Sequence, residues 1–318
     1  MTAAVLLEGL RHEYRRAGSP PRLALNGVSW EVPEGELFGV LGPNGGGKTT
    51  LFRILSTALR PTAGRAALFG IDVAAAPAAA REKIGVVFQS PSLDKKLSVH
   101  ENMIHQGRLY GLRGQDLRRR ASDLLGRLGL ADRAGDIVET LSGGLQRRAE
   151  IAKGLLHRPA LLLMDEPTTG LDPGARRDVW TYLALLKKEG VTVLVTTHLM
   201  EEAERCGRLV ILDQGNVAAL GTPASLKKEI QGDVLTVQTP APEKLAAGLR
   251  EKFDLRASVL EGAVRLERPN AHEWISKIMA AFPELVVSAS VGKPTLEDVF
   301  ILHTGHRFWA AAPAGPGE

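Results

Sequence analysis

The sequence predicts an α/β fold built on a parallel sheet, followed by a smaller α+β domain. Three short, continuous apolar runs have the pattern of strands that are buried on both faces, as the central strands of a parallel sheet are: 37–41, 161–164 and 191–195. Helical patterns lie between them, which is typical of an α/β layer. The first run leads through a glycine-rich loop into helical periodicity over 49–59, so the order there is strand, loop, helix.

The size and composition of the chain limit the classes of protein to which it could belong. Its 318 residues are enough for two domains, and its net charge of +4 favours anionic ligands over a dedicated nucleic-acid surface. The single cysteine, Cys206, excludes an internal disulfide, favours a reducing cytosolic setting and is expected to be a small buried residue. No segment approaches the ~20 apolar residues that cross a bilayer, and no signal sequence is recognisable at the start. We therefore expect a protein that neither crosses the membrane nor is exported.

The elements around the parallel strands complete a first domain over residues 1–228. The apolar runs 3–10 and 28–32 are separated by Gly/Pro-rich turns and predict antiparallel strands. Residues 91–158 are mostly helical in pattern and predict a helical subdomain inserted into the α/β core. Ser98 and Glu101 are spaced as a capping box that would open one of its helices.

A second domain is predicted over residues 229–305. Its order, β-α-β-β-α-β, is the split βαβ arrangement of ferredoxin-like domains. Thr295 and Asp298 are spaced as a capping box for a last helix, and the tail 306–318, rich in Ala, Pro and Gly, is expected to be disordered. In chain order the strand and helix patterns cover 233–239, 243–253, 257–260, 263–266, 271–282 and 285–291.

The glycine-rich loop after the first buried strand fits the phosphate-binding pattern G-x-x-x-x-G-K-[ST]. Where a strand leads through such a loop into a helix, backbone N–H groups and the helix dipole converge on an anion. We expect Lys48 to reach the β- and γ-phosphates of a nucleotide and Thr49 to bind Mg²⁺. The alternative is a glycine-rich turn that carries an exposed lysine. The loop consists of Gly42, Pro43, Asn44, Gly45, Gly46, Gly47, Lys48 and Thr49.

Two further sites could bind phosphates or the metal. The strand 161–164 runs directly into Asp165 and Glu166, which places both carboxylates at the C-terminal edge of the sheet, where α/β proteins bind ligands. Asp165 suits a ligand of Mg²⁺ and Glu166 suits a base that polarises an attacking water. Taken alone, such a pair more often marks a strand that ends in a helix N-cap, and the phosphate-binding loop reverses that balance. Ser142 precedes an amphipathic run and can cap a helix whose first N–H groups are free to bind a second anion.

Taken together, these motifs resemble those of ABC ATPases over roughly the first 228 residues, and they occur in that family's order. Residues 42–49 resemble Walker A, Gln89 the Q-loop, 141–146 the signature motif and 161–166 Walker B. Residues 170–173 then resemble the D-loop, and His198 the switch histidine. The resemblance implies a P-loop NTPase core with an antiparallel β subdomain and a helical subdomain.

The resemblance also implies a head-to-tail dimer that sandwiches two ATP molecules with Mg²⁺. Gln89 would sense Mg²⁺ and the attacking water, and His198 would contact the γ-phosphate; alone, a histidine there is more often structural. Tyr14 would stack on adenine, or else be a surface aromatic at a strand edge. Thr50 would join the residues that bind ATP within one copy. The residues expected to bind ATP from the other copy are Ser142, Gly143, Gly144, Gln146 and Asp172.

The sequence departs from the family pattern at two positions. Leu145 stands where the signature usually has glutamine, and Gln146 follows it. We expect this to be tolerated because Ser142 and backbone N–H groups make the main phosphate contacts. Gly46 stands where Ala or Ser is commoner, which should loosen the loop slightly.

Three strings, 168–173, 197–203 and 294–300, resemble the daunorubicin/doxorubicin-resistance type of exporter ATPase. That group implies a separate membrane permease, a place at the cytoplasmic face of the membrane, and export of drugs, lipids, polysaccharides or ions. The C-terminal domain is expected to help dimerisation or regulation. An importer ATPase is a second hypothesis. A soluble ABC ATPase of DNA repair or translation is a third, disfavoured because the interval between Lys48 and Ser142 has no heptad run and the chain has one cysteine.

Overall fold

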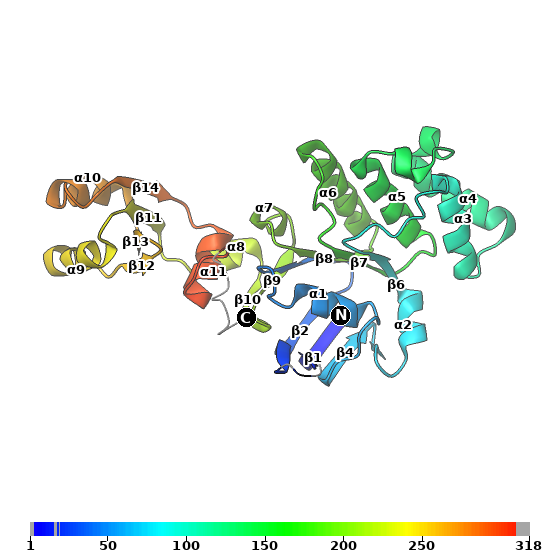
Figure 1. Cartoon of the computed structure of the whole chain (residues 1–318), viewed down its shortest axis with the longest axis horizontal. Coiled ribbons are helices and arrows are strands. Elements are labelled where there is room, and N and C mark those ends of the chain that lie inside the picture. The colour runs from blue at the N-terminus through cyan, green and yellow to red at the C-terminus, as the bar shows by residue number, and fades with distance from the viewer. Residues whose placement is uncertain (1–2, 16–17, 19, 310–318) are drawn as a thin grey trace. The chain divides into compact units, whose positions relative to one another are not determined.

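The computed structural model describes residues 3–15, 18 and 20–309, and the chain divides into two compact units, Met1–Val217 and Ala218–Glu318 (Figure 1). The sequence placed the domain boundary later, after residue 228. The difference arises because helix α8 (Pro223–Lys227) packs against helix α11 (Leu296–Thr304), so its contacts lie in the second unit.

The first unit contains an antiparallel sheet of the order β2-β1-β4-β5. Its two long strands pair along most of their length, and Val5, Leu7 and Trp30 point from them into a buried cluster. Antiparallel strands were expected here from the apolar runs, and the structure shows them longer than those runs. The strands are β1 (Ala3–Tyr14), β2 (Arg22–Pro33), β4 (Ala63–Leu68) and β5 (Ile71–Asp72).

The second sheet has the order β10-β9-β3-β8-β7-β6, and the pairs from β9 to β6 are parallel. Every residue of β3, β7 and β8 is buried, as the continuous apolar runs predicted. Along β7, Leu161 and Leu163 join the cluster beneath the antiparallel sheet, whereas Leu162 and Met164 join the cluster beneath α5 and α6. The strands are β3 (Leu37–Leu41), β6 (Ile84–Val87), β7 (Leu161–Asp165), β8 (Thr192–Thr197), β9 (Arg208–Asp213) and β10 (Asn216–Gly221).

Helices cover this sheet on both faces, with α1 on the side of the antiparallel sheet and α5 and α6 on the other (Figure 1). Helix α1 ends earlier than the periodicity over 49–59 suggested, because Thr57 adopts a left-handed φ of 62°. The capping box at Ser98 is confirmed. The helices are α1 (Lys48–Leu55), α2 (Pro77–Lys83), α3 (Val99–Leu109), α4 (Gly114–Arg127), α5 (Gly143–Leu155), α6 (Pro173–Lys188) and α7 (Met200–Ala203), and α3 to α5 form the expected helical subdomain.

The second unit contains an antiparallel sheet of the order β12-β13-β11-β14, which is the arrangement of ferredoxin-like domains. Leu235, Val264 and Ile278 belong to its buried core. The capping box at Thr295 is confirmed. The elements are β11 (Asp233–Gln238), α9 (Pro242–Phe253), β12 (Ser258–Leu260), β13 (Ala263–Arg268), α10 (His272–Ala281), β14 (Ser288–Gly292) and α11.

Residues 306–309 were expected to belong to a disordered tail, but the structure describes them and packs one of them into the fold. Phe308 is buried, and its ring lies 5.0 Å from that of Phe300 in an edge-to-face arrangement. The Ala/Pro/Gly-rich segment 310–318 lies outside the described residues.

Candidate active site

The glycine-rich loop connects β3 to α1, as the sequence predicted. Gly47, the residue before the helix, has a φ of 109°, and a Cβ there would lie 2.7 Å from the carbonyl oxygen of Ala24. A Cβ at Gly42 would lie 2.4 Å from the carbonyl oxygen of Leu212. These two positions therefore require glycine. Gly46 is different: its Cβ would meet two carbonyl oxygens at 3.0 and 3.1 Å, so a small side chain would need only a slight shift.

Lys48 is buried at the start of α1, with 4% of the residue exposed. Its Nζ donates hydrogen bonds to the carbonyl oxygens of Gly42, at 2.8 Å, and Pro43, at 3.1 Å. The same ammonium lies 3.3 Å from Oε1 of Glu166. Burial lowers the pKa of Lys48, and the carboxylate of Glu166 opposes that shift. The lysine is thus held at the mouth of the loop by groups that a phosphate could replace.

Glu166 is held by its own backbone and by several side chains. It follows β7 with a left-handed φ of 44°, which is unusual for a residue other than glycine. Its N–H donates to the carbonyl oxygen of Thr196, at 3.1 Å, and to the hydroxyl of that residue, at 3.0 Å. Oε2 lies 3.3 Å from the amide nitrogen of Gln89, which donates to it, and 2.9 Å from Nδ1 of His198. Lys48, Gln89 and His198 therefore meet at the carboxylate of Glu166. The sequence identified each of the four residues from a separate motif.

Asp165 lies beside this group at the end of β7 and is also buried. The hydroxyl of Thr196 donates to its Oδ1 at 2.5 Å. Burial raises the pKa of Asp165, and the hydrogen bond from Thr196 opposes the rise. Its carboxylate and the exposed hydroxyl of Thr49 are both oxygen donors, the ligand type that Mg²⁺ prefers.

A cleft of about 270 Å³ connects the loop to these residues. Tyr14, from the end of β1, lies at its edge, and its hydroxyl is 3.3 Å from that of Thr50. Arg22, at the start of β2, was not anticipated from the sequence, although a cation beside a phosphate loop is a recognisable signal. The lining residues are Tyr14, Arg22, Ala24, Asn44, Gly45, Gly47, Lys48, Thr49, Thr50, Gln89 and Glu166.

The signature and D-loop residues lie at two helix N-termini. Ser142 caps α5 by accepting a hydrogen bond from the N–H of Leu145 at 3.4 Å, and both Ser142 and Gly143 are exposed. Asp172 caps α6 by accepting from the N–H groups of Gly174 and Ala175, and these bonds lower its pKa. Among the described residues, the side chains of Ser142 and Asp172 form these cap bonds and no hydrogen bond to a residue that lines the cleft.

Gln146, which was expected to bind ATP from the other copy, forms hydrogen bonds within its own chain. Its amide nitrogen donates to the carbonyl oxygens of Val138, at 3.1 Å, and Leu141, at 3.0 Å. Both donors of the amide are therefore engaged by the turn that precedes α5. Through these two bonds Gln146 stabilises the turn before α5, because its side chain is long enough to reach back along the helix.

A buried ion pair on α5, Arg147 with Glu150, was missed by the sequence analysis. The guanidinium of Arg147 lies 2.8 Å from Oε2 of Glu150 and donates to the carbonyl oxygens of Phe88, at 2.7 Å, and Gln89, at 3.0 Å. Glu150 in turn accepts from the N–H of Ser92. The pair fixes the backbone of the Q-loop to the signature helix. Two charges on the apolar side of an amphipathic run were the available signal.

Comparison with known proteins gives concordant results. The profile of the ABC transporter family matches residues 25–169. The chain is 43% identical to the doxorubicin resistance ATP-binding protein DrrA of Mycobacterium tuberculosis, over 95% of this chain and 93% of the relative. It is 39% identical to the Nod factor export ATP-binding protein I of Ralstonia nicotianae, over 96% and 94%.

Solved structures agree with these relatives. A dimeric ATP-binding cassette in a post-hydrolysis state, bound to ADP and Pi, is 30% identical and superposes with a TM-score of 0.62. The match covers 69% of this chain and 98% of the cassette.

Proposed function

This chain belongs to the ABC transporter family, whose ATP-binding proteins are ATPases, and from that premise we propose that it powers export through a separate membrane permease. The observation that carries the ATPase part of this proposal is the convergence of Lys48, Gln89 and His198 on the carboxylate of Glu166, and the export part is supported by the relatives. A base needs to be within reach of the groups that bind the phosphate and orient the water, and this arrangement provides that.

Each residue of this group has a distinct part in the proposed reaction. The phosphates of ATP bind the N–H groups of the loop and the ammonium of Lys48, which exchanges loop carbonyl oxygens for phosphate oxygens. Glu166 accepts a proton from the water that attacks the γ-phosphate, and Gln89 and His198 hold that water and the phosphate in place. Thr49, Gln89 and Asp165 would hold Mg²⁺, which neutralises charge on the phosphate oxygens when it is bound.

The second half of the nucleotide site would come from another copy of the chain. Ser142, Gly143 and Asp172 are exposed at the N-termini of α5 and α6, and Gly144 is partly buried beside them. A helix N-terminus with free N–H groups favours an anion, here the γ-phosphate held by the other copy. The dimeric state of the similar cassette supports this arrangement.

We infer the permease, the location of the protein and the cargo class from the relatives. No helix in the described part of the chain is long and apolar enough to cross a membrane. We infer that the protein binds the cytoplasmic face of the membrane through the permease. The relatives are named for doxorubicin resistance and Nod factor export, so the cargo class would be a drug, lipid, polysaccharide or similar molecule. We assign the ferredoxin-like domain an accessory role in dimerisation or regulation.

The test is the variant Glu166→Gln, compared with the wild type and with Glu31→Gln, an exposed carboxylate on β2. Loss of the base should lower phosphate release by about 10²–10⁴-fold while ATP still binds. ATP should also shift this variant to a dimer in size-exclusion chromatography, because a nucleotide that is not hydrolysed keeps the halves together. Near-normal turnover by Glu166→Gln would reject the catalytic assignment.

A further inference from the structure

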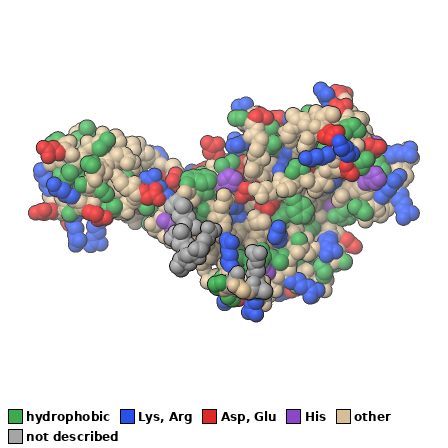
Figure 2. Space-filling view, in the orientation of Figure 1, with side chains coloured by type: hydrophobic (Ala, Val, Ile, Leu, Met, Phe, Trp, Pro, Cys, Tyr) green, Lys and Arg blue, Asp and Glu red, His purple; other side chains and the backbone are tan. Residues whose placement is uncertain are grey.

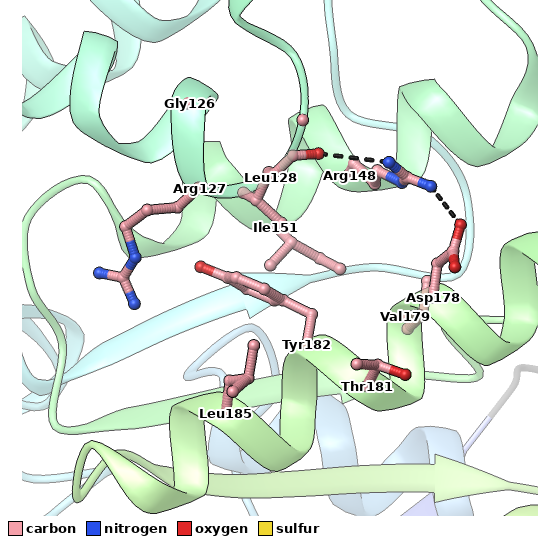
Figure 3. Close-up of a pocket in the computed structure, with 11 residues that line it drawn as sticks. Gly126, Arg127, Leu128, Arg148, Ile151, Asp178, Val179, Thr181, Tyr182 and Leu185 are labelled. Carbon is pink, nitrogen blue, oxygen red and sulfur yellow. Dashed lines mark hydrogen bonds and ion pairs between the residues drawn. The ribbon is translucent and has the colours of Figure 1, made fainter.

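A cavity of about 350 Å³ lies between the helical subdomain and helix α6, where the end of α4, helix α5 and helix α6 meet (Figure 3). It shares no residue with the nucleotide cleft. Leu128, Ile151, Val179 and Leu185 give it apolar walls from all three elements. Its volume lies in the range of cavities that hold small organic ligands.

The charged groups at the rim of the cavity neutralise one another. Arg148, on α5, forms an ion pair with Asp178, on α6 (Figure 3). Arg127, at the end of α4, forms an ion pair with Glu189, just beyond α6. Each guanidinium is matched by a carboxylate, so the rim offers no net charge that would select an ion. A neutral ligand fits this rim better than an anion or a cation.

Tyr182 supplies a polar group that its own chain does not use. Only 7% of the residue is exposed, and its hydroxyl has no hydrogen-bond partner within the described residues. The ring lies between Ile151 and Leu185 in the cavity wall (Figure 3). Burial raises the pKa of Tyr182 to about 12, so the hydroxyl remains a neutral donor. Buried hydroxyl groups are nearly always paired, and a ligand would supply the missing acceptor.

A neighbouring cavity of about 360 Å³ also has Arg127 and Tyr182 in its wall. Tyr182 therefore belongs to the walls of both spaces.

We propose that the cavity between α4, α5 and α6 binds a neutral, mostly apolar small molecule whose hydrogen-bond acceptor pairs with the hydroxyl of Tyr182. The apolar walls provide the favourable burial of surface, and the hydroxyl fixes the orientation. An apolar side chain of a partner protein is the competing occupant, and the experiment below separates the two.

Occupancy of this cavity should alter ATP hydrolysis, a consequence that rests on the proposed function. The two helices that line it carry Ser142 and Asp172 at their N-termini. They pack so closely near those ends that a Cβ on Gly144 would lie 2.8 Å from the Cβ of Ala175. A molecule wedged between α5 and α6 farther along would change how these ends are presented to a second copy.

Benzophenone is a suitable probe because it is neutral and apolar, carries one carbonyl acceptor, and forms covalent bonds with nearby C–H groups under ultraviolet light. The wild-type protein, without nucleotide, should show saturable labelling on the peptides that contain Ile151 and residues 179–185. Tyr182→Phe keeps the ring and removes the donor, so the half-saturating concentration should rise by up to about tenfold. Its melting temperature should be unchanged or higher, since the unpaired hydroxyl is gone.

Leu185→Trp should abolish the labelling by filling the mouth of the cavity, and the fold should tolerate it because Leu185 is half-exposed. Leu109→Trp is the matched control, because it adds the same side chain at an exposed position of the same subdomain and should leave the labelling unchanged. In the wild type, benzophenone should change ATP turnover over the concentration range in which it binds.

Three results would overturn the proposal. The first is labelling that does not saturate or is spread over the chain. The second is equal labelling of wild type, Tyr182→Phe and Leu185→Trp. The third is complete protection of these peptides when the permease is bound, which would make the cavity a docking site for protein. Because binding is measured without ATP, failure here is distinguishable from failure of the proposed ATPase function.

Discussion

The residues around Glu166 and the N-termini of α5 and α6 differ in how far the chain itself satisfies them. Around Glu166, two buried charges meet, because Lys48 lies against the carboxylate, and the exposed Gln89 and the partly buried His198 approach its other oxygen. At the helix N-termini, Ser142 and Gly143 are exposed, and only the local caps are formed. One half of the site is preorganised within a single copy, whereas the other half is not completed by contacts within that copy. This contrast is what a site shared between two copies requires.

The first prediction removes the cation from the preorganised half. Lys48→Met should weaken ATP binding by roughly 10³-fold, because a buried charge that binds phosphate is lost and Glu166 is left without its lysine partner. Equilibrium binding of a fluorescent ATP analogue measures the effect. Lys96→Met, which replaces an exposed lysine in the helical subdomain, is the control and should bind as the wild type does. Equal affinity in both variants would contradict the account.

The second prediction concerns the link between the two halves. Arg147→Met leaves Glu150 buried without its cation, so the free energy of unfolding should fall by about 3 kcal/mol. The double variant Arg147→Met/Glu150→Met removes both charges and should recover part of that loss. Urea unfolding of the three variants gives the values. If the single variant were as stable as the wild type, the pair would not hold the Q-loop against α5.

The third prediction uses the lowered pKa of Lys48. Between that lowered value and its ordinary value of 10.5, the unfolded chain binds more protons than the folded chain. The lysine's contribution to the free energy of unfolding therefore rises with pH across this window. Relative to Lys48→Met, the wild type should become more stable as the pH is raised from neutral to about 10. A difference that stays constant with pH would show that burial does not perturb this lysine.

The fourth prediction has the smallest expected effect and concerns the exposed N-terminus of α5. Leu145→Gln restores the residue that is usual in the family. The side chain packs only at the edge of the core, so the free energy of unfolding should fall by about 1 kcal/mol or less. ATP turnover should change little, because Ser142 and the backbone N–H groups are retained. A large gain in turnover would mean that Leu145 limits the signature contact.

The sequence predicted the parts of the molecule that depend on local patterns. The continuous apolar runs identified the buried strands, and the Ser98 and Thr295 boxes identified helix starts, because each signal lies within a few residues. The order of motifs likewise assigned Lys48, Gln89, Glu166 and His198 to one nucleotide site, and the structure brings these side chains together. Chemistry concentrated in short segments can be recognised without knowing how those segments are arranged.

Features that depend on how side chains pack in the folded chain were not predictable. Arg147 reaches the carbonyl oxygen of Gln89 across the interface between α5 and the Q-loop, and no local pattern indicates this. Gln146 was expected to face ATP, but two carbonyl oxygens of the preceding turn engage its amide. Phe308 looked like part of a tail, yet the ring of Phe300 covers it. In each case the deciding partner becomes apparent only when the fold is known.

The claim that two copies share each site is tested most directly by mixing two inactive variants. Lys48→Met lacks the phosphate-binding cation, and Ser142→Arg blocks the exposed N-terminus of α5. In a mixed head-to-tail dimer, one site carries both defects, whereas the other combines an intact Lys48 with an intact Ser142.

We predict that each variant alone hydrolyses almost no ATP and that the mixture recovers activity, because the mixed dimers contain one complete site. If the mixture remained as inactive as its components while the two variants were shown to associate, each site would lie within a single copy, and the shared-site account would be wrong.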